Sequence, residues 1–469
     1  MITNKFVHTP EKIATTAQSA PRIDERGFVW LDSALQDHPR SISSFFAEEP
    51  VGELVLRGNR FAFSGAAEQF SHCGNSLYAA LEAIYDSGQY VAVGFVSYEA
   101  MLESIGISAR NHPVIPLAHF FLYDNFSLNL SLPRNQGADP STHRLRSGQA
   151  KLRTSGIPLS GGTAHSCTDP SQLSLPRLSR AESRGRREPS LNSSTLTDQI
   201  SREDYSAKIQ RIKDYIREGD IYQANFTSRF EVESQLHPAH VYHRLRQSSP
   251  ASHCAFLNFG DYQIVSSSPE RMFRLEGDLI ITNPIKGTIR RTGNPEDDAV
   301  LAETLLNSQK NLAELLMIVD LERNDLGRIA KTGTVTVDCL RQIESYSSLI
   351  HLVAQVSATV REDCGLAETL MALLPGGSIT GAPKRRAIEI ISELESTPRS
   401  VYTGCIGYLD GRNRIAEFNI AIRTMTHYDG RYEIHAGGGI VADSTAADEY
   451  DEMMLKASRM LSAVGIDRN

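Results

Sequence analysis

The spacing of apolar residues along the chain predicts a mixture of strands and helices. Runs rich in β-branched and aromatic residues, which are typical of strands, lie on both sides of residue 133. They are VGELVLRGNRFAFSG, YVAVGFVSYEA and HFFLYDNFSLNLSL before it, and QANFTSRFEVE, ASHCAFLNF, YQIVSSS, DLIITNPI and RYEIHAGGGIV after it. The stretch from Arg414 to Thr424 is also expected to be a strand.

Helices are predicted where apolar residues recur every three or four positions. One such run ends at the stop signal Gly219, and its apolar residues are Tyr205, Ile209, Ile212 and Ile216. Further helices are expected over about 297–318, 364–373 and 384–395, with Pro383 in the first turn of the last, and from Ser444 onward. Because strands and helices do not alternate one by one, the pattern favours an α+β fold with antiparallel sheets.

Residues 133–197 interrupt this pattern. They are rich in Ser, Gly, Pro and Arg and poor in aromatic residues, so they bury too little apolar surface to offset the entropy of ordering. We expect a flexible basic linker or insertion between an N-terminal part, residues 1–132, and a C-terminal part, residues 198–469. Its positive charge is either simply solvated or docks onto an acidic partner, and the pattern leaves both open.

Composition favours a protein that acts on a small molecule. The chain has 469 residues, 41% of them hydrophobic, a net charge of -8 and a pI near 6.0, which argues against a nucleic-acid binder that works through bulk charge. Six scattered cysteines show no CxxC pair, so neither a zinc site nor a disulfide framework is indicated. The N-terminus lacks an apolar signal region and no apolar run reaches the length of a membrane span, so we expect a cytoplasmic protein.

Candidate chemistry begins with the acidic residues of DSTAADEYDEMMLKASRM. If Ser444 caps a helix, then Glu449, Glu452 and Lys456 share one face, which is either a functional cluster or a solvated, salt-bridged surface. In KNLAELLMIVDLERND, Glu314 lies among apolar residues and needs a cation or an arginine partner. Carboxylates without nearby His or Cys favour Mg²⁺ over Zn²⁺.

Two glycine-rich or basic stretches could hold an anion. Gly437, Gly438 and Gly439 follow a strand, so their backbone N–H groups could bind a carboxylate, although a tight turn would explain them equally well. Arg423 could grip the same anion or simply face solvent.

A lysine in NPIKGTIRR is a candidate nucleophile. Lys286 precedes a Gly-Thr pair that lets the backbone approach a ligand closely, and Glu270 in SSSPERMF comes sixteen positions earlier. An acid and a lysine on neighbouring loops could serve as general acid and nucleophile, or could form a surface ion pair of little energetic value.

Nine sequence blocks in a fixed order resemble the chorismate-utilising enzymes. They are SPER, PIKGT, IVDLERND, SYSSLIHLV, PGGSITGAPKRRAIEII, IGYLDG, IRT, AGGGIVADS and EYDEMMLKA, within the span from Tyr205 to Leu461. The resemblance implies two stacked, largely antiparallel sheets flanked by helices, built as one domain from both halves of the chain, with residues 198–469 as the chorismate-binding part. PIKGT is similar to component I of aminodeoxychorismate synthases, whereas anthranilate synthases carry Ala at the position of Lys286.

The resemblance also implies the role of each site residue. Lys286 maps to a covalent nucleophile and Glu270 to a general acid, whereas Gln223 replaces the lysine that activates water in isochorismate and salicylate synthases. Mg²⁺ on Glu314 and Glu452, with Glu449 close by, would hold the ring carboxylate of chorismate. The remaining substrate-contacting positions are Gly287, Thr288, His351, Thr380, Tyr402, Arg423, Gly437, Gly438, Gly439 and Lys456.

The implied reaction is a transaminase-class transfer of amide nitrogen to chorismate, giving 4-amino-4-deoxychorismate for p-aminobenzoate and folate synthesis. We find no glutaminase domain in the chain and therefore expect a separate glutamine amidotransferase subunit to supply ammonia. VWLDSAL resembles a tryptophan-binding segment, so Ser33 and Pro250 could line such a pocket, unless they simply pack in the core. The alternatives are an anthranilate synthase component I and a non-catalytic chorismate- or tryptophan-binding regulatory subunit.

Overall fold

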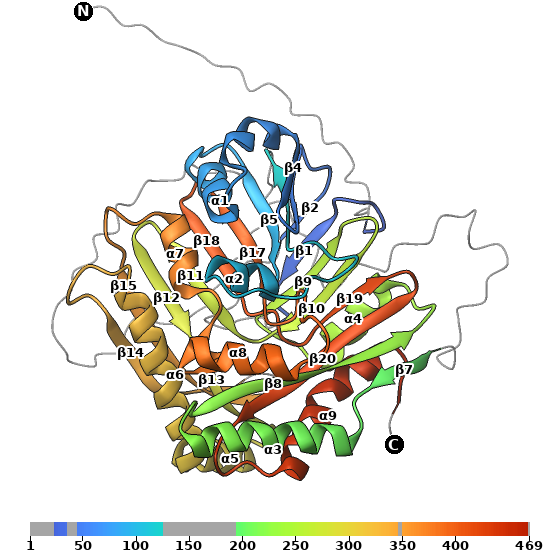
Figure 1. Ribbon diagram of the computed structural model, residues 1–469, viewed down its shortest axis with the longest axis vertical. Coiled ribbons are helices and arrows are strands. Elements are labelled where there is room, and N and C mark those ends of the chain that lie inside the picture. The colour runs from blue at the N-terminus through green and yellow to red at the C-terminus, as the bar shows by residue number, and fades with distance from the viewer. Residues whose placement is uncertain (1–22, 35–44, 125–193, 346–348, 468–469) are drawn as a thin grey trace, which may run out of the picture.

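Two large antiparallel sheets form the framework of the molecule. The computed structural model describes residues 23–34, 45–124, 194–345 and 349–467 (Figure 1). In these ranges one sheet has nine strands in the order β16-β8-β20-β19-β10-β9-β1-β2, with β7 beside β8. Its strands are β1 (Val29–Asp32), β2 (Phe45–Ala47), β7 (Thr195–Gln199), β8 (Gln223–Glu233), β9 (His253–Asn258), β10 (Gln263–Ser268), β16 (Gly381–Ala382), β19 (Thr424–Tyr428) and β20 (Arg431–Ile440).

The second sheet has eleven strands in the described residues. Their order is β13-β15-β12-β11-β18-β17-β5-β6-β3-β4, with β14 beside β15. The strands are β3 (Gly52–Arg57), β4 (Arg60–Gly65), β5 (Val91–Val96), β6 (Ala118–Tyr123), β11 (Arg271–Glu276), β12 (Leu279–Asn283), β13 (Ile285–Arg290), β14 (Thr336–Ser345), β15 (Leu349–Thr359), β17 (Cys405–Asp410) and β18 (Ile415–Asn419). Every pairing is antiparallel, which confirms the predicted α+β class.

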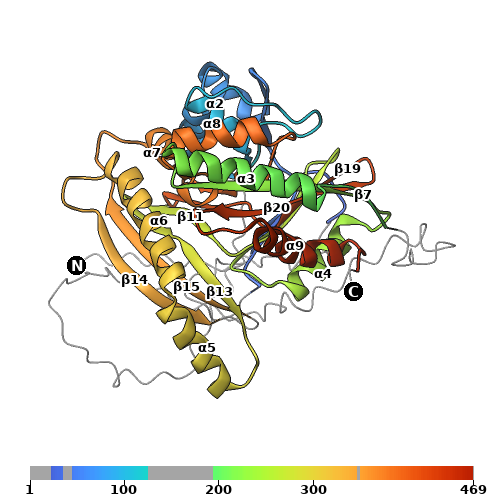
Figure 2. The same ribbon diagram turned by 60° about the horizontal axis from the view of Figure 1, so that its bottom comes forward.

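Helices cover the outer faces of the sheets. The nine-stranded sheet buries apolar side chains against α3 (Arg202–Glu218), α4 (Pro238–Ser248), α8 (Lys384–Leu394) and α9 (Ala446–Ala463). Figure 2 shows α3, α8 and α9 alongside the strands β8 and β20. The other sheet packs against α1 (Leu77–Asp86), α2 (Tyr98–Ser104), α5 (Pro295–Asn307), α6 (Gln309–Gly327) and α7 (Leu366–Leu373).

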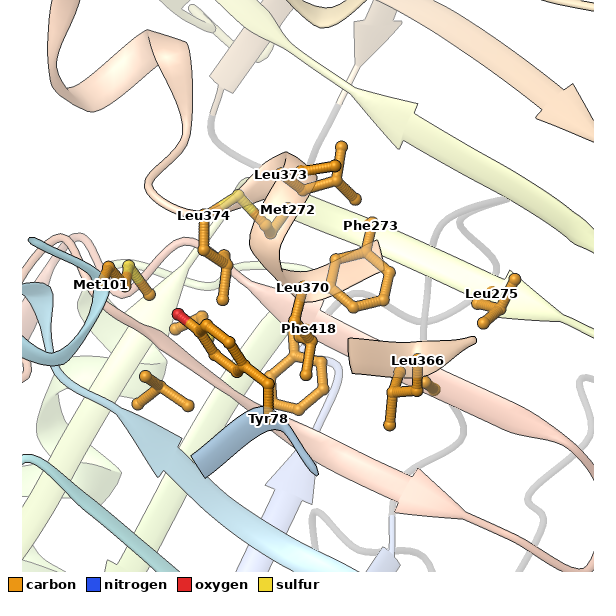
Figure 3. Packing of buried hydrophobic residues seen from close by; sticks show 14 of the residues in the cluster. Tyr78, Met101, Met272, Phe273, Leu275, Leu366, Leu370, Leu373, Leu374 and Phe418 are labelled. Atoms are coloured by element: carbon orange, nitrogen blue, oxygen red, sulfur yellow. The ribbon is translucent and has the colours of Figure 1, made fainter. Parts of the chain in front are cut away.

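The core joins both halves of the chain. Tyr78 of α1 and Met101 of α2 pack with Phe273 of β11 and Phe418 of β18, as Figure 3 shows. A separate cluster fills the space between the sheets, where Leu31 and Phe95 meet Ile264. The pairings of β1 with β9 and of β5 with β17 bring strands from before and after residue 133 into each sheet. The C-terminal part, residues 198–469, is therefore built together with strands from the N-terminal part.

Helix starts differ from those that the sequence predicted. The single helix expected over 297–318 is two helices, α5 and α6, because Ser308 ends the first and its side chain accepts the N–H of Asn311 at the start of the second. Pro383 is the cap residue before α8 and does not lie in its first turn. Thr445, not Ser444, caps α9 by accepting the N–H of Asp448.

The predicted linker falls mostly outside the described residues, which resume at Ser194. Its last residues, from Thr195, belong to β7, whose partner is β8. The linker boundary at 197 was therefore placed too late. The five cysteines in the described ranges are free thiols. No helix in those ranges is both long and apolar enough to cross a bilayer.

Candidate active site

Three charged side chains of α9 gather over strand β20. Lys456 Nζ lies 2.7 Å from Glu452 Oε1 and donates to the carbonyl oxygen of Gly437 at 3.0 Å. One turn earlier, Glu449 is buried and its Oε1 accepts the hydroxyl of Ser444 at 2.6 Å. The predicted face of α9 thus has one buried carboxylate, Glu449, and a half-exposed ion pair between Glu452 and Lys456 at the edge of β20.

The three glycines lie inside β20, not after it. Gly437, Gly438 and Gly439 pair with Thr227, Phe226 and Asn225 of β8. The strand predicted in RYEIHAGGGIV continues through the glycines to Ile440, so the alternative of a tight turn at the glycines is wrong. Glycine is needed at position 437 for another reason. A Cβ at Gly437 would lie 2.1 Å from the carbonyl oxygen of Phe226, so the backbones of β20 and β8 are too close there for any larger residue.

Gly438 opens a space in front of the acidic cluster. A Cβ at this position would lie 3.2 Å from Glu449 Oε2, 3.6 Å from Lys456 Nζ and 3.8 Å from Glu452 Oε1. Two carboxylates and one ammonium thus converge on the same point above the strand. A ligand that contacts them would rest on bare backbone.

The two carboxylates have opposite pKa shifts. Burial raises the pKa of Glu449, and the neighbouring Glu452 raises it further, although the Ser444 hydroxyl opposes this. Burial also disfavours charge on Glu452, but Lys456, Lys310 and Lys286 outweigh it and lower the pKa of Glu452. Glu452 is therefore the more firmly ionised of the pair.

This donor set suits Mg²⁺. The described residues contain no group of three or more His, Cys, Asp or Glu side chains arranged to hold a metal ion. Mg²⁺ does not need such a cage, because it keeps several waters and commonly binds through one or two carboxylates plus oxygens of the substrate. Glu449 and Glu452, whose oxygens converge in front of Gly438, supply two such carboxylates.

Glu314 lies on α6, four residues after Lys310 and hence on the same helix face. Lys310 is close enough to α9 to lower the pKa of Glu452. This face of α6 therefore lies toward the acidic cluster. In the described part of the chain Glu314 forms no ion pair, so the arginine partner considered from the sequence is not found there. The structure does not place Glu314 in direct contact with Glu449 or Glu452, and its metal role stays a prediction.

Lys286 lies in a β-bulge of strand β13. The register between β13 and β15 shifts between Ile285 and Thr288, which leaves Lys286 and Gly287 outside the regular pairing. Gly287 has φ +81°, and a Cβ there would meet Leu305 and Asn311 within 3.0 Å. The half-buried Lys286 makes no hydrogen bond or ion pair with the described residues, and its charge reaches Glu452.

Thr288 and His351 are neighbours across the same strand pair. Thr288 lies opposite His351 in β15, and the Thr288 hydroxyl is 2.7 Å from His351 Nδ1. This contact fixes the orientation of the buried His351, which lies opposite the end of the bulge in β13. The structure thus brings together two side chains that the sequence separates by 63 positions.

Glu270 is buried at the start of β11. Its carbonyl oxygen accepts the N–H of Ile420, and the next residue, Arg271, pairs with Asn283 shortly before the bulge at Lys286. A second carboxyl, Glu322 of α6, accepts the hydroxyl of Thr282 at 2.6 Å. Burial, together with the nearby charge of Glu270, raises the pKa of Glu322 to about 8, although the hydrogen bond from Thr282 opposes the shift. Sequence analysis missed Glu322 because its position in IVDLERND reveals nothing about Glu270.

Arg423 lies where the chain passes from one sheet to the other. The strand expected over 414–424 ends at Asn419, and β19 begins at Thr424 in the opposite sheet. Arg423 has φ +51° in this connection, and its Nη1 is 3.5 Å from the hydroxyl of Ser249. The sheet crossing, and not a strand face, determines where the arginine points.

Tyr402 and Thr380 lie near this connection. The N–H of Thr403, the residue after Tyr402, donates to Ala421. The Tyr402 ring stacks on His435 of β20 with a centroid separation of 5.3 Å. Thr380 is fully buried, and its carbonyl oxygen accepts the N–H of Asn225 at 2.8 Å. Both predicted residues thus contact the strands that carry the glycines.

Gln223 presents an unused donor beside these glycines. Its buried Nε2 has no hydrogen-bond partner within the described residues, and a Cβ at Gly439 would lie 2.7 Å from it. Such a donor is available to a substrate. A glutamine amide at this position cannot act as the amine that a lysine would offer.

The two residues predicted to line a tryptophan pocket lie close together. The N–H of Ala34 donates to Ala251, which places Ser33 beside Pro250. A cavity of about 10 Å³ lies between the sheets with Leu31, Tyr408 and Glu417 in its wall, but neither Ser33 nor Pro250 lines it. This volume holds a single water. Binding of tryptophan by Ser33 and Pro250 stays a prediction.

Comparison with known proteins assigns the chain to a family. Residues 27–462 match a family model described as chorismate binding enzyme. The chain belongs to this family. Among solved structures, anthranilate synthase component I from Streptococcus pneumoniae is 26% identical, covers 96% of this chain and 95% of its own, and has a TM-score of 0.66. The isochorismate synthase MenF from Escherichia coli has a TM-score of 0.64 at 16% identity and shows the same fold.

Relatives in the family carry names for two different products. Anthranilate synthase component 1 from Acetivibrio thermocellus is 43% identical over 273 residues, 58% of this chain and 55% of that protein. A second anthranilate synthase component 1, from Haloarcula marismortui, is 36% identical over 386 residues, 80% of this chain and 75% of its own length. Aminodeoxychorismate synthase component 1 from Bacillus subtilis is 41% identical over 260 residues, 55% of each chain. The matches to the Acetivibrio and Bacillus proteins thus span just over half of those proteins.

These findings confirm the predicted family of chorismate-utilising enzymes. They do not support the transaminase class that we expected for the reaction, because the relatives are named synthases. Lys310 and Glu322 are additional polar residues of the site that sequence analysis did not single out. Ser444 was named there only as a helix cap, whereas its side chain contacts Glu449.

Proposed function

We propose that the protein is component I of an aminodeoxychorismate synthase, which converts chorismate and ammonia to 4-amino-4-deoxychorismate for p-aminobenzoate and folate synthesis. The observation that carries this proposal is the position of Lys286. Its amine lies in a glycine bulge of β13, makes no contact with the described residues that would occupy it, and lies within electrostatic reach of the carboxylate of Glu452. A lysine held in this way has the freedom that a nucleophile requires.

The first step forms a covalent bond to the lysine. The neutral amine of Lys286 attacks C2 of chorismate, the ring double bond shifts, and the C4 hydroxyl leaves as water. Glu270 gives the departing hydroxyl its proton. His351, held by the hydroxyl of Thr288, borders this region.

The second step releases the lysine. Ammonia attacks C4, the double bond shifts back, and the C2–N bond to Lys286 breaks. Division of one difficult substitution into two such steps is the usual advantage of covalent catalysis. Gln223 cannot provide a basic amine to activate water, which favours ammonia over water as the nucleophile.

The chain binds the substrate through its carboxylates. Lys456 and the backbone of Gly438 contact one carboxylate, and Arg423 and Tyr402 contact the enolpyruvyl carboxylate. Glu449 and Glu452, together with Glu314, would hold Mg²⁺. When bound, the ion neutralises the negative charge of the ring carboxylate and orients the ring. The glutamine amidotransferase that supplies ammonia is a separate subunit in this proposal.

An anthranilate synthase component I is the second candidate, because the relatives from Acetivibrio and Haloarcula carry that name. Such an enzyme would place the amino group at C2 and release pyruvate. Lys286 occupies space beside the cluster and offers a competing nucleophile, which disfavours direct attack by ammonia at C2.

The deciding experiment identifies the products. Purified protein is incubated with chorismate, Mg²⁺ and ammonium chloride at mildly alkaline pH, and the mixture is separated by chromatography with mass and ultraviolet detection. Aminodeoxychorismate without pyruvate supports the proposal. Anthranilate with an equal amount of pyruvate would instead show the second candidate to be correct. No turnover of chorismate, with or without a glutaminase, would indicate the regulatory subunit considered above.

A further inference from the structure

A surface cleft lies apart from the residues assigned so far. It has a volume of about 290 Å³ and lies where α2, the segment 108–110 and the end of α8 meet. Residues of α2 and of the end of α8 line the same cleft, and Figure 2 shows these two helices on the same side of the molecule. Its inner wall contains Tyr98, Glu99, Glu395 and Arg399, and Ser108 and Ser392 lie at its exposed rim. None of these residues has a role in the proposed catalytic steps.

The inner wall holds buried polar groups that are not fully used. The Tyr98 hydroxyl is buried and has no hydrogen-bond partner in the described part of the chain. Glu99 is 3% exposed, and its Oε1 accepts the backbone N–H groups of Arg399 and Ser400. Within the described ranges it forms no ion pair. A small polar molecule that reaches this wall would therefore find both a hydroxyl and a carboxylate.

Arg399 separates the cleft from the substrate-binding residues. Its guanidinium stacks on the Tyr98 ring at 4.5 Å and forms two hydrogen bonds with the carboxylate of Glu395. On its other side it donates to the carbonyl oxygens of Ile379 and Asn225. These carbonyls belong to the residue before Thr380 and to the strand partner of Gly439. The cleft and the active site thus share one wall that is a single side chain thick.

We propose that this cleft is the port through which ammonia enters on its way to the active site, an inference that rests on the proposed function. The reaction consumes ammonia, and the port would serve ammonia from solution as well as ammonia released by a glutaminase on the rim. The cleft is small for chorismate but ample for ammonia and a few waters. Its wall carries two carboxylates, Glu99 and Glu395, and two guanidinium groups, Arg110 and Arg399, so it has no excess of positive charge that would select an anionic ligand.

The charges of the wall suit the delivery of neutral ammonia. Ammonium, like other amines, is largely protonated near neutral pH. The carboxylate of Glu99 attracts it and can take one proton, which gives ammonia and a carboxylic acid that later loses its proton to solvent. Burial raises the pKa of Glu99 to about 7, which suits reversible proton uptake. The fixed positive charge of Arg399 then opposes passage of any ion that is still protonated.

The test blocks the cleft from its rim. Ser392→Trp and Ser108→Trp each place a large ring at an exposed edge of the cleft, where neither variant disturbs the core. Ser71→Trp is the matched control, because Ser71 is exposed on the short helix at Ala66–Cys73. For each protein the ammonium and chorismate concentrations at half-maximal rate are measured, and the glutamine-dependent rate is measured with a glutaminase subunit present.

If ammonia enters through the cleft, blocking the rim should impair the use of ammonia but not the binding of chorismate. Both rim variants should raise the half-saturating ammonium concentration at least fivefold and lower the glutamine-dependent rate, while the value for chorismate and the Tm stay close to those of Ser71→Trp. Glu99→Gln should also raise the half-saturating ammonium concentration, while the half-saturating chorismate concentration should stay within twofold of the wild-type value. If both rim variants have an unchanged half-saturating ammonium concentration, ammonia does not enter through this cleft, even if glutamine-dependent turnover falls. A wild-type protein that turns over no chorismate contradicts the proposed function itself, whichever way the variants behave.

Discussion

The hydroxyl of Ser444 donates a hydrogen bond of 2.6 Å to the carboxylate of Glu449. Both side chains are buried, and the serine lies just before the helix that carries the glutamate. The hydrogen bond opposes the effect of burial on Glu449 and fixes the direction of its carboxylate. Residues that orient a metal ligand in this way commonly affect metal affinity without touching the metal.

Removal of this hydroxyl should weaken Mg²⁺ binding. We expect Ser444→Ala to raise the Mg²⁺ concentration at half-maximal activity roughly tenfold, measured in chorismate turnover and, independently, by calorimetric titration of the free protein with Mg²⁺. Thr445→Ala is the matched control, because the neighbouring hydroxyl caps the helix instead. It should cost about 1 kcal/mol of stability and leave the Mg²⁺ dependence unchanged. Equal Mg²⁺ dependence in the two variants would contradict the role assigned to Ser444.

The adjacent glycines of β20 should respond differently to a methyl group. Gly437→Ala places a Cβ against the backbone of β8, and we expect a loss of roughly 2–3 kcal/mol in the free energy of unfolding. Gly438→Ala meets only the ends of side chains, so its stability should change by less than about 1 kcal/mol.

Gly438→Ala, the more stable of the two variants, should nevertheless lose activity. The methyl group of Gly438→Ala fills the space between Glu449 and Lys456, so turnover should fall at least tenfold in a protein of nearly normal stability. Urea unfolding and steady-state kinetics measure the two effects. A Gly438→Ala protein with normal kinetics would show that no ligand occupies this space.

The lysines near the cluster should not be equivalent. Lys286→Ala should lower kcat by a factor on the order of 10² to 10⁴, because it removes the proposed nucleophile. Lys310→Ala removes a nearby positive charge and should mainly alter Mg²⁺ and substrate affinity, with kcat within about tenfold. Mass spectrometry of wild-type protein quenched during turnover without ammonia should detect a covalent adduct on the peptide that contains Lys286. Similar losses of kcat in both variants, with no adduct, would favour a purely electrostatic role.

His435 should make folding sensitive to mild acid. Burial lowers the pKa of this side chain to about 3, so the folded protein keeps it neutral while the unfolded chain, with a pKa near 6.5, takes up a proton. The unfolded state then binds more protons between pH 6.5 and pH 3, and stability falls as the pH falls through this window.

The size of this effect can be measured in one pair of experiments. Between pH 7 and pH 5 His435 should account for about 2 kcal/mol of lost unfolding free energy, given ~1.4 kcal/mol for each unit of pKa shift. His435→Gln should lose correspondingly less on acidification in urea titrations at the two pH values. His72→Gln, at an exposed histidine, is the control and should behave like the wild type. Identical pH dependence in all three proteins would rule out a neutral, buried His435.

Much of the site could be predicted because local spacing fixes it. Glu449, Glu452 and Lys456 fall on one face of any helix that includes them, so the sequence placed them together before the structure was known. The helix of α3 and its stop at Gly219 were predicted for the same reason, and Gly219 indeed ends the helix in a left-handed conformation. In each case the decisive interactions join residues within a few positions of one another.

Other predictions failed where a strand partner or a sheet crossing decides the outcome. Gly437 to Gly439 read as a loop because glycine is a turn residue, yet pairing with β8 keeps them in a strand. Arg423 read as a strand residue, yet the chain changes sheets at that point. The bulge at Lys286 depends on pairing with β15, some sixty residues away, which no local pattern encodes.

The sequence by itself determined the family and most of the order of strands and helices, and it proposed the chemistry of Lys286 and of the acidic face of α9. These depend on residue identity and on spacing within single elements. Only the tertiary structure decided that α9 lies over Gly438, that Glu322 lies near Glu270, and that Arg399 separates a surface cleft from Thr380. Such contacts arise when distant strands pair and helices pack on the resulting sheets, because burial selects the partner by shape and charge in three dimensions and not by distance along the chain.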